Sequence, residues 1–175
     1  MSDFEFSENE VQRYARHIVL KEVGGTGQMK LKRGRVLIVG AGGLGSPLAM
    51  YLAAAGVGTI GIVDADMVEL SNLQRQIAHG MKDIGTPKVD SAKATMGDMN
   101  PEVTVHAHNT RLNASNVMDL IADYDVIADG SDNFDTRFLL NDACYLAGKT
   151  LVSGAALRFD GQVSTFKAHL GSPHP

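Results

Sequence analysis

Apolar and polar positions alternate along the chain in blocks that predict strands and helices in turn. Short apolar runs, typical of buried parallel strands, occur at 35–39, 59–64, 125–129 and 150–156, and a further strand is predicted over 104–108. The stretches between them have apolar residues at helical spacing, which predicts helices over 47–55, 87–98, 114–122 and 136–147. A sixth strand is predicted over 161–168. Strands that alternate with helices predict an α/β fold with a doubly wound, mostly parallel, Rossmann-like sheet.

A helical segment over residues 1–34 is predicted to precede this domain, which we place at 35–175. Ser7 and Glu10 form a capping box, and the apolar residues that follow lie on one helical face. We expect Gly24 to Gly27 to break this helix, and a short basic helix over 28–33 to lead into the first strand. Residues 170–175 look like a loop with no closing element, so we expect the domain to be truncated at its C-terminus.

The residues after the first predicted strand have the pattern of a nucleotide-binding loop. The pattern G-x-G-x-x-G is formed by Gly40, Gly42 and Gly45, with Gly43 inside it. Its glycines allow a tight turn, a close approach of phosphate to the backbone, and close packing of helix on strand. Free N–H groups at the start of the next helix favour an anion. The alternative is a glycine-rich turn that binds no ligand.

Helix-start residues and an acid support the nucleotide interpretation of this loop. Ser46 is expected to cap the helix, with Pro47 at its first position. Thr86 and Pro87 are expected to begin a later helix in the same way. Asp64 ends the second predicted strand 19 residues after Gly45, where a ribose-binding carboxylate is expected.

Polar side chains cluster after the second and fourth predicted strands, at the edge where open α/β sheets bind ligands. The clusters contain Asp64, Asp66, Asn72, Arg75 and Gln76, then Asp129, Ser131, Asp132 and Asn133, with Lys88 at a helix start between them. Arg75 and Lys88 suit several phosphates, and Asp132 is a hard oxygen ligand for a phosphate-bound Mg²⁺. This set favours a nucleoside triphosphate over a nicotinamide dinucleotide.

Simpler structural roles remain open for several of these residues. Lys88 would then be a solvated lysine at a helix start, and Asp132 with Asn133 a helix cap. Asp129 is expected to support the strand end rather than to touch a ligand. An NAD-dependent oxidoreductase is the alternative enzyme class, because it would use the glycine loop and Asp64.

Composition narrows the classes of function. A net charge of −4 argues against a nucleic-acid binder, and no apolar run approaches the roughly 20 residues of a membrane span. The single cysteine, Cys144, excludes an internal disulfide and indicates a reducing cytoplasm. Cys144 is expected to be a buried structural thiol. His106 and His108 are expected to share one strand face without a third metal ligand.

The ordered motifs together resemble the ThiF/MoeB/HesA family, bacterial relatives of ubiquitin-activating enzymes. They are Arg13-Tyr-Ala-Arg16-His17, Gly40–Gly45, Asp64, Leu70–Gln76, Pro87-Lys88, Ser131-Asp132-Asn133 and Val152–Ala156. The likeness covers about Glu10 to Lys167, and Leu70–Gln76 is its most specific part. Residues 151–166 look more like the MoeB branch than the ThiF branch.

This resemblance implies an adenylyltransferase that uses ATP and Mg²⁺. Such enzymes activate the C-terminal glycine carboxylate of a small ubiquitin-like sulfur-carrier protein in molybdenum cofactor or thiamine biosynthesis, and they release pyrophosphate. By resemblance Asp64 holds the ribose, Asn72, Arg75 and Lys88 contact the phosphates, and Asp132 positions Mg²⁺. Arg16 resembles the arginine that enters the partner subunit's site, which implies a homodimer.

The chain departs from the family pattern near its C-terminus. Family members usually carry zinc-binding cysteine pairs, the first soon after a Ser-Pro like Ser172-Pro173, and this sequence has none. We therefore expect this departure to affect carrier binding and turnover more than nucleotide binding, and a catalytically silent nucleotide-binding module is the remaining alternative.

Overall fold

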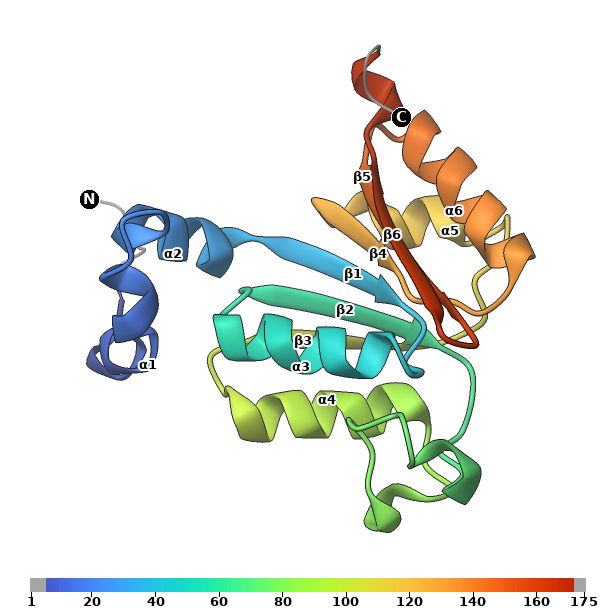
Figure 1. The fold of residues 1–175 in the computed structure, drawn as a ribbon, viewed down its shortest axis with the longest axis horizontal. Coiled ribbons are helices and arrows are strands. Elements are labelled where there is room, and N and C mark those ends of the chain that lie inside the picture. The colour runs from blue at the N-terminus through green and yellow to red at the C-terminus, as the bar shows by residue number, and fades with distance from the viewer. Residues whose placement is uncertain (1–5, 172–175) are drawn as a thin grey trace.

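The computed structural model describes residues 6–171 and contains one six-stranded sheet (Figure 1). Its order is β3-β2-β1-β4-β5-β6. The strands are β1 Arg35–Val39, β2 Thr59–Asp64, β3 Thr104–Asn109, β4 Val126–Asp129, β5 Thr150–Leu157 and β6 Asp160–Phe166. The pairs from β3 to β5 are parallel, and β6 is antiparallel to β5. The predicted mostly parallel sheet is therefore confirmed.

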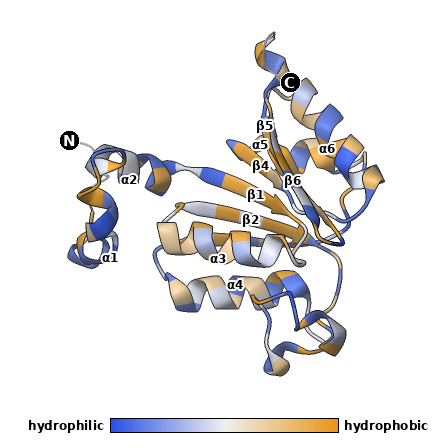
Figure 2. Cartoon of the chain, in the orientation of Figure 1, coloured by the Kyte–Doolittle hydropathy of each residue, from blue (hydrophilic) through white to orange (hydrophobic). Residues whose placement is uncertain are grey.

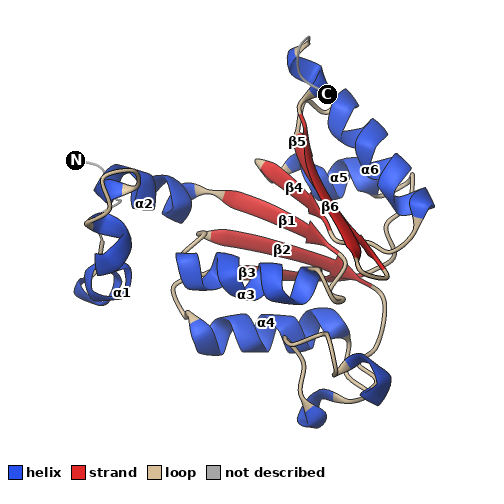
Figure 3. Cartoon of the chain, in the orientation of Figure 1, coloured by secondary structure: helices blue, strands red, loops and turns tan. Residues whose placement is uncertain are grey.

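Helices cover both faces of this sheet, as Figures 1 and 3 show. Helices α3 (Gly45–Ala55) and α4 (Lys88–Met99) pack on one face, and α5 (Val117–Ala122) and α6 (Phe134–Leu146) pack on the other. Because successive strand residues point to opposite faces, Ile38 joins the first core while Leu37 and Val39 join the second. Figure 2 shows the central strands as mostly hydrophobic, as burial on both faces requires.

In the described part of the chain, two helices precede the sheet, α1 (Glu8–Ile18) and α2 (Gly24–Arg33). The predicted capping box is present: the Glu10 N–H donates to Ser7 Oγ (3.2 Å), and the Ser7 N–H donates to Glu10 Oε2 (2.8 Å). The predicted break at Gly24–Gly27 is wrong, because these residues form the first turn of α2. The chain turns just before them, and Gly24 accommodates the turn with a φ of +61°.

The predicted helix starts at Ser46 and Thr86 are also wrong. α3 begins at Gly45 after Leu44, and the Ser46 hydroxyl donates to the carbonyl of Ala41 (3.2 Å) instead of capping the helix. The Thr86 hydroxyl likewise donates to the Asp83 carbonyl (2.7 Å), and α4 begins at Lys88. Both hydroxyls find a loop carbonyl within reach, which a one-dimensional pattern does not reveal.

The ends of other elements shift slightly from their predicted places. α5 begins at residue 117 rather than 114, because an Asn113–Asn116 turn precedes it. The predicted terminal loop at 170–175 is described only at its first two residues, and Leu170 ends a short 3-10 helix (Ala168–Leu170). Its remaining residues, with the Ser172-Pro173 pair, lie outside the described residues. Within residues 6–171, no helix combines the length and apolar character needed to cross a membrane.

Candidate functional site

The glycine loop lies where the strand order reverses, between β1 and β4, which is where doubly wound sheets bind ligands. Gly40 has a φ of +94°, and a Cβ added there would lie 3.0 Å from the Gly130 carbonyl oxygen. A Cβ on Gly45 would lie 1.7 Å from the Gly40 carbonyl oxygen. Both positions therefore require glycine, and the loop is held against the ends of β1 and β4.

Asp64 is fixed at the end of β2 by backbone amides. Its Oδ2 accepts the Ala41 N–H (2.7 Å) from the glycine loop, and its Oδ1 accepts the Asp66 N–H (2.8 Å). Each carboxylate oxygen keeps a further lone pair for a ligand hydroxyl. The predicted ribose-binding acid thus lies directly against the predicted phosphate loop.

The crossover segment, residues 65–87, folds back over the glycine loop. The Arg75 side chain lies 3.5 Å from where a Cβ of Gly43 would stand, and Gln76 Nε2 lies 3.7 Å from that of Gly42. Gln76 is buried, and its Oε1 is a buried oxygen without a hydrogen-bond partner in the described chain. Buried polar atoms normally have partners, so this orphaned oxygen beside the loop suits a ligand donor.

Asn72 shapes the turn that carries Arg75. Its carbonyl accepts the N–H groups of Arg75 (3.1 Å) and Gln76 (3.0 Å), and its side-chain oxygen accepts the Glu69 N–H (3.1 Å). Arg75 is exposed, with a long contact from Nη1 to the Ser71 carbonyl (3.4 Å). Its guanidinium therefore retains donors for a phosphate.

Lys88 is buried at the first residue of α4, so the alternative of a solvated lysine is wrong. Its Nζ lies 2.9 Å from Asp66 Oδ2, and the side chains are 7% and 70% exposed, respectively. The ammonium thus lies inside the protein and pairs with a carboxylate at the surface. A buried cation of this kind can also pair with a second anion, such as a phosphate, when a ligand binds.

Asp129 supports the strand end, as predicted. It is buried, and it accepts the hydroxyls of Ser131 (2.6 Å) and Ser153 (2.7 Å). Arg137, which the sequence analysis missed, lies 3.6 Å from Asp129 and donates to the carbonyls of Ser131 and Gly154. This network fixes the loop that begins at Gly130.

Asp132 and Asn133 follow in that loop with different surroundings. Asn133 caps α6, because its Oδ1 accepts the Thr136 N–H (2.9 Å). Asp132 is exposed, and its carboxylate receives only a long contact (3.5 Å) from Asn133 Nδ2 within the described chain. The capping alternative is thus correct for Asn133 and wrong for Asp132.

A Mg²⁺ at this site would need the phosphates of a nucleotide. Among residues 6–171 no group of three or more potential metal-ligating side chains comes together. Phosphate-bound Mg²⁺ typically takes only one or two carboxylates, with phosphate and water oxygens completing its shell. The exposed carboxylate of Asp132 fits that requirement.

Comparison with known proteins identifies the family. A sequence profile of the ThiF family matches residues 14–174. The chain belongs to the ThiF family. The fold and the Gly40–Gly45 loop described above are thus those of a ThiF-family domain, as the sequence resemblance predicted.

Relatives of this ThiF-family chain include much longer proteins. It is 54% identical over 160 residues to the probable adenylyltransferase/sulfurtransferase MoeZ of Mycobacterium tuberculosis, which covers 91% of this chain and 41% of MoeZ. It is 50% identical to the adenylyltransferase and sulfurtransferase MOCS3 of Culex quinquefasciatus, over 93% of this chain and 37% of MOCS3. It is 51% identical to the SAMP-activating enzyme E1 of Haloferax volcanii, over 89% of this chain and 58% of that enzyme.

Solved structures share the fold. PaaA matches with a TM-score of 0.83 and 26% identity, covering 98% of this chain and 56% of PaaA. The crystal structure of E. coli MccB with ATP matches with a TM-score of 0.74 and 27% identity, covering 82% of this chain and 44% of MccB. The chain therefore spans about half the length of these structures.

Arg16 of this ThiF-family chain lies away from the other predicted site residues. Helix α1 packs on the C-terminal ends of α3 and α4, where Tyr14 contacts Asn100 (2.8 Å) and Arg13 Nη1 donates to the Met99 carbonyl (3.0 Å). The glycine loop is at the other end of α3. The structure thus brings together the predicted residues from Gly40 to Asn133 along one sheet edge, but not Arg16.

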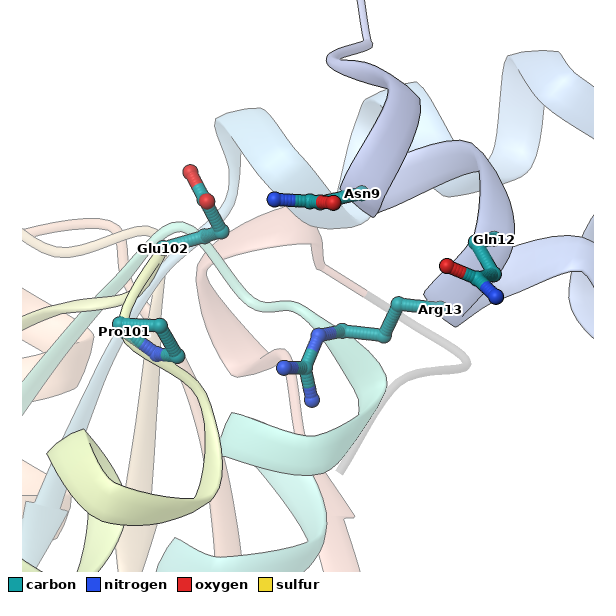
Figure 4. A pocket seen from close by; sticks show the side chains of 5 residues that line it. All are labelled: Asn9, Gln12, Arg13, Pro101 and Glu102. Carbon is teal, nitrogen blue, oxygen red and sulfur yellow. The ribbon is translucent and has the colours of Figure 1, made fainter.

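A cavity of about 340 Å³ opens beside α1, at the edge opposite the glycine loop (Figure 4). It is lined by four polar residues and one proline, namely Asn9, Gln12, Arg13, Glu102 and Pro101. It contains no residue of the predicted nucleotide site, so we assign the site from the glycine loop rather than from this cavity.

Cys144 and the histidine pair behave as structural groups. Burial, with a smaller effect of Asp129, raises the pKa of the Cys144 thiol to about 11, which keeps it protonated. His106 and His108 share a strand face as predicted, and both contact the hydroxyl of Tyr124 (3.4 and 3.1 Å). A phenol rather than a metal ligand set links them.

Proposed function

We propose that this chain is the ATP-binding adenylation module of an enzyme that activates a small ubiquitin-like sulfur-carrier protein, in molybdenum cofactor or thiamine biosynthesis. The observation that carries the proposal is the pair of cations, buried Lys88 and exposed Arg75, on the crossover segment beside the glycine loop. A dinucleotide site uses the glycine loop and the ribose-binding acid, which would leave these two cations without a role. The names of the relatives support adenylyl transfer.

In the proposed reaction, a carboxylate oxygen of the carrier's C-terminal glycine attacks the α-phosphorus of ATP. A P–O bond forms to the carboxylate, and the bond to the pyrophosphate oxygen breaks. The products are an acyl-adenylate and pyrophosphate, and the carboxylate needs no base because it is already ionised. Asp64 would accept the ribose hydroxyls, while the loop amides, Arg75 and Lys88 would hold the phosphates.

Charge on the phosphates is the main obstacle to this attack. Fixed cations that meet the developing charge lower the barrier without reorganising during the reaction. Lys88 is suited to this role because burial makes its charge act through a medium of low polarity. Asp132 would hold Mg²⁺, which when bound neutralises charge on the phosphates.

The proposal includes a cytoplasmic homodimer in which Arg16 acts on the partner subunit's site. Arg16 lies at the opposite end of α3 from its own glycine loop, so a contribution to adenylation requires a second chain. Exposed aromatic residues on α6 support an assembly, since Phe134 and Phe138 are 76% and 66% exposed and their rings stack.

Ligand-dependent melting tests the nucleotide. ATP·Mg²⁺ at 100 times its dissociation constant is expected to add about 2.7 kcal/mol of stability. Lys88→Met is expected to reduce that gain, while Lys82→Met, an exposed lysine of the same crossover segment, leaves it unchanged. A larger stabilisation by NAD than by ATP would replace this proposal with a nicotinamide-dependent oxidoreductase. ATP binding without ATP–pyrophosphate exchange would indicate a silent binding module.

A further inference from the structure

A buried histidine connects three parts of the site that are far apart in the sequence. His79 belongs to the crossover segment and is 7% exposed. Its Nε2 lies 3.1 Å from the Ala41 carbonyl oxygen of the glycine loop, and its Nδ1 lies 2.9 Å from the Ser91 hydroxyl of α4. A buried ring with both nitrogens engaged is well fixed in position.

The contacts determine which nitrogen carries the proton. A carbonyl oxygen only accepts hydrogen bonds, so Nε2–H donates to Ala41, and Nδ1 accepts the Ser91 hydroxyl. Burial, together with the charge of nearby Lys88, lowers the pKa of His79, so the neutral ring persists at physiological pH. His79 is therefore a neutral donor to the loop backbone.

Both backbone polar groups of Ala41, its N–H and its carbonyl, make hydrogen bonds to side chains. Its N–H donates to Asp64 (2.7 Å), and its carbonyl accepts both His79 and the Ser46 hydroxyl (3.2 Å). In a trans peptide, the carbonyl of one residue and the N–H of the next point in opposite directions. Drawing the Ala41 carbonyl toward the interior therefore turns the Gly42 N–H outward. Within the described residues this N–H has no acceptor.

We propose that His79 is a positioning residue that aims the Gly42 N–H at a nucleotide phosphate by holding the Ala41 carbonyl. This inference rests on the proposed function, because it takes the phosphate of ATP as the group that Gly42 meets. Ser91 in turn holds the ring from α4, the helix that also carries Lys88. One rigid connection thus links the loop amide and the buried cation.

Matched variants separate this role from ordinary packing. Glutamine at position 79 places an amide donor where Nε2 was, whereas asparagine reaches only the Nδ1 position next to Ser91. We expect His79→Gln to bind ATP·Mg²⁺ with an affinity near that of the wild type. We expect the ATP·Mg²⁺ affinity of His79→Asn to be about tenfold lower, which corresponds to the loss of one hydrogen bond to a charged group. Adenosine, which lacks phosphates, should bind both variants equally well.

A control comes from a similar contact that does not reach the loop. The Thr95 hydroxyl of α4 donates to the Ala78 carbonyl (2.7 Å), and Ala78 directly precedes His79 in the sequence. Thr95→Val should lower the melting temperature and leave the ratio of ATP to adenosine affinity unchanged. Should His79→Asn not fold, His79→Leu replaces it in the comparison.

The spectroscopic readout is the Gly42 amide in nitrogen–proton correlation spectra. Its resonance should shift on addition of ATP·Mg²⁺ in the wild type and in His79→Gln, and shift much less in His79→Asn. Equal ATP affinity and equal Gly42 shifts in all three proteins would overturn the role of His79. A wild-type chain that binds no ATP would overturn the proposed function, and this inference with it.

Discussion

At the residue scale, Asp132 and Asn133 are neighbours whose side chains do different things. Asn133 caps α6, and the Asp132 carboxylate makes no described contact shorter than 3.5 Å. We therefore expect Asp132→Ala to slow ATP–pyrophosphate exchange by roughly 10²–10³-fold, since it would remove one stabilising contact to the phosphates through Mg²⁺. Exchange rates measured beside melting temperatures check this, and stability should change by no more than about 0.5 kcal/mol.

Two further variants make the Asp132 prediction specific. Asp132→Asn keeps an oxygen acceptor but removes the charge, and a metal role makes it nearly as inactive as the alanine variant. Asp135→Ala removes the same charge from an exposed position in the first turn of α6, and it should keep normal exchange. A fully active Asp132→Asn enzyme would remove Asp132 from the site.

The residues that the sequence analysis missed share a physical property. Arg137 and His79 act on backbone carbonyls, those of Ser131, Gly154 and Ala41. Every residue has a carbonyl, so no side-chain pattern marks which of them will need a donor. By contrast, Asp64 could be located because its spacing from the glycine loop follows from strand and helix lengths, and Lys88 because it stands at the start of a predicted helix.

At the element scale, the start of α1 combines a cap with an ion pair. Glu10 Oε2 accepts the Ser7 N–H and lies 2.8 Å from Lys32 Nζ of α2. Burial alone would raise the pKa of Glu10, but the hydrogen bonds from Lys32 and Ser7 outweigh it and leave this pKa below its ordinary value. The ionised carboxylate therefore stabilises the folded state.

This lowered pKa predicts how stability depends on pH. Glu10→Gln keeps the capping hydrogen bond and loses the charge, so at pH 7 it should cost about 1 kcal/mol. The stabilisation is present above the ordinary glutamate pKa of about 4.3 and is lost as pH falls through the lower folded-state pKa. Melting curves of the two proteins should therefore converge in acid. Glu8→Gln, an exposed acid of the same turn, should follow the wild type throughout.

The sequence predicted a helix or strand correctly where the pattern of apolar residues was unambiguous. It did not predict where each element begins and ends. Strands β1, β2 and β4 are buried on both faces, and their short, continuous apolar runs suit neither a solvated loop nor an amphipathic helix. Helix ends depend on single hydroxyls, and the hydroxyls of Ser46 and Thr86 had loop carbonyls as competing partners. The antiparallel pairing of β6 likewise depends on the short turn after β5, which alternation alone does not specify.

At the scale of the whole molecule, the position of Arg16 decides what assembly the proposed reaction needs. Helix α3 has 11 residues and separates the two ends of this face by about 16 Å. Arg16 belongs to the helix packed at one end, and the glycine loop lies at the other. Arg16 can therefore act on a triphosphate only if a second chain binds that triphosphate, and a twofold dimer would build both sites alike.

Mixing two inactive variants tests this shared site. In an active form of the enzyme, Arg16→Ala and Asp132→Ala homodimers should each have little ATP–pyrophosphate exchange. In a mixed dimer, one site regains both Asp132 of one chain and Arg16 of the other, while its second site lacks both. With random exchange half of the dimers are mixed, so about a quarter of the wild-type activity should return. Size-exclusion chromatography of tagged chains establishes that exchange has taken place. Exchanged dimers that recover no activity would show that Arg16 does not serve the partner's site.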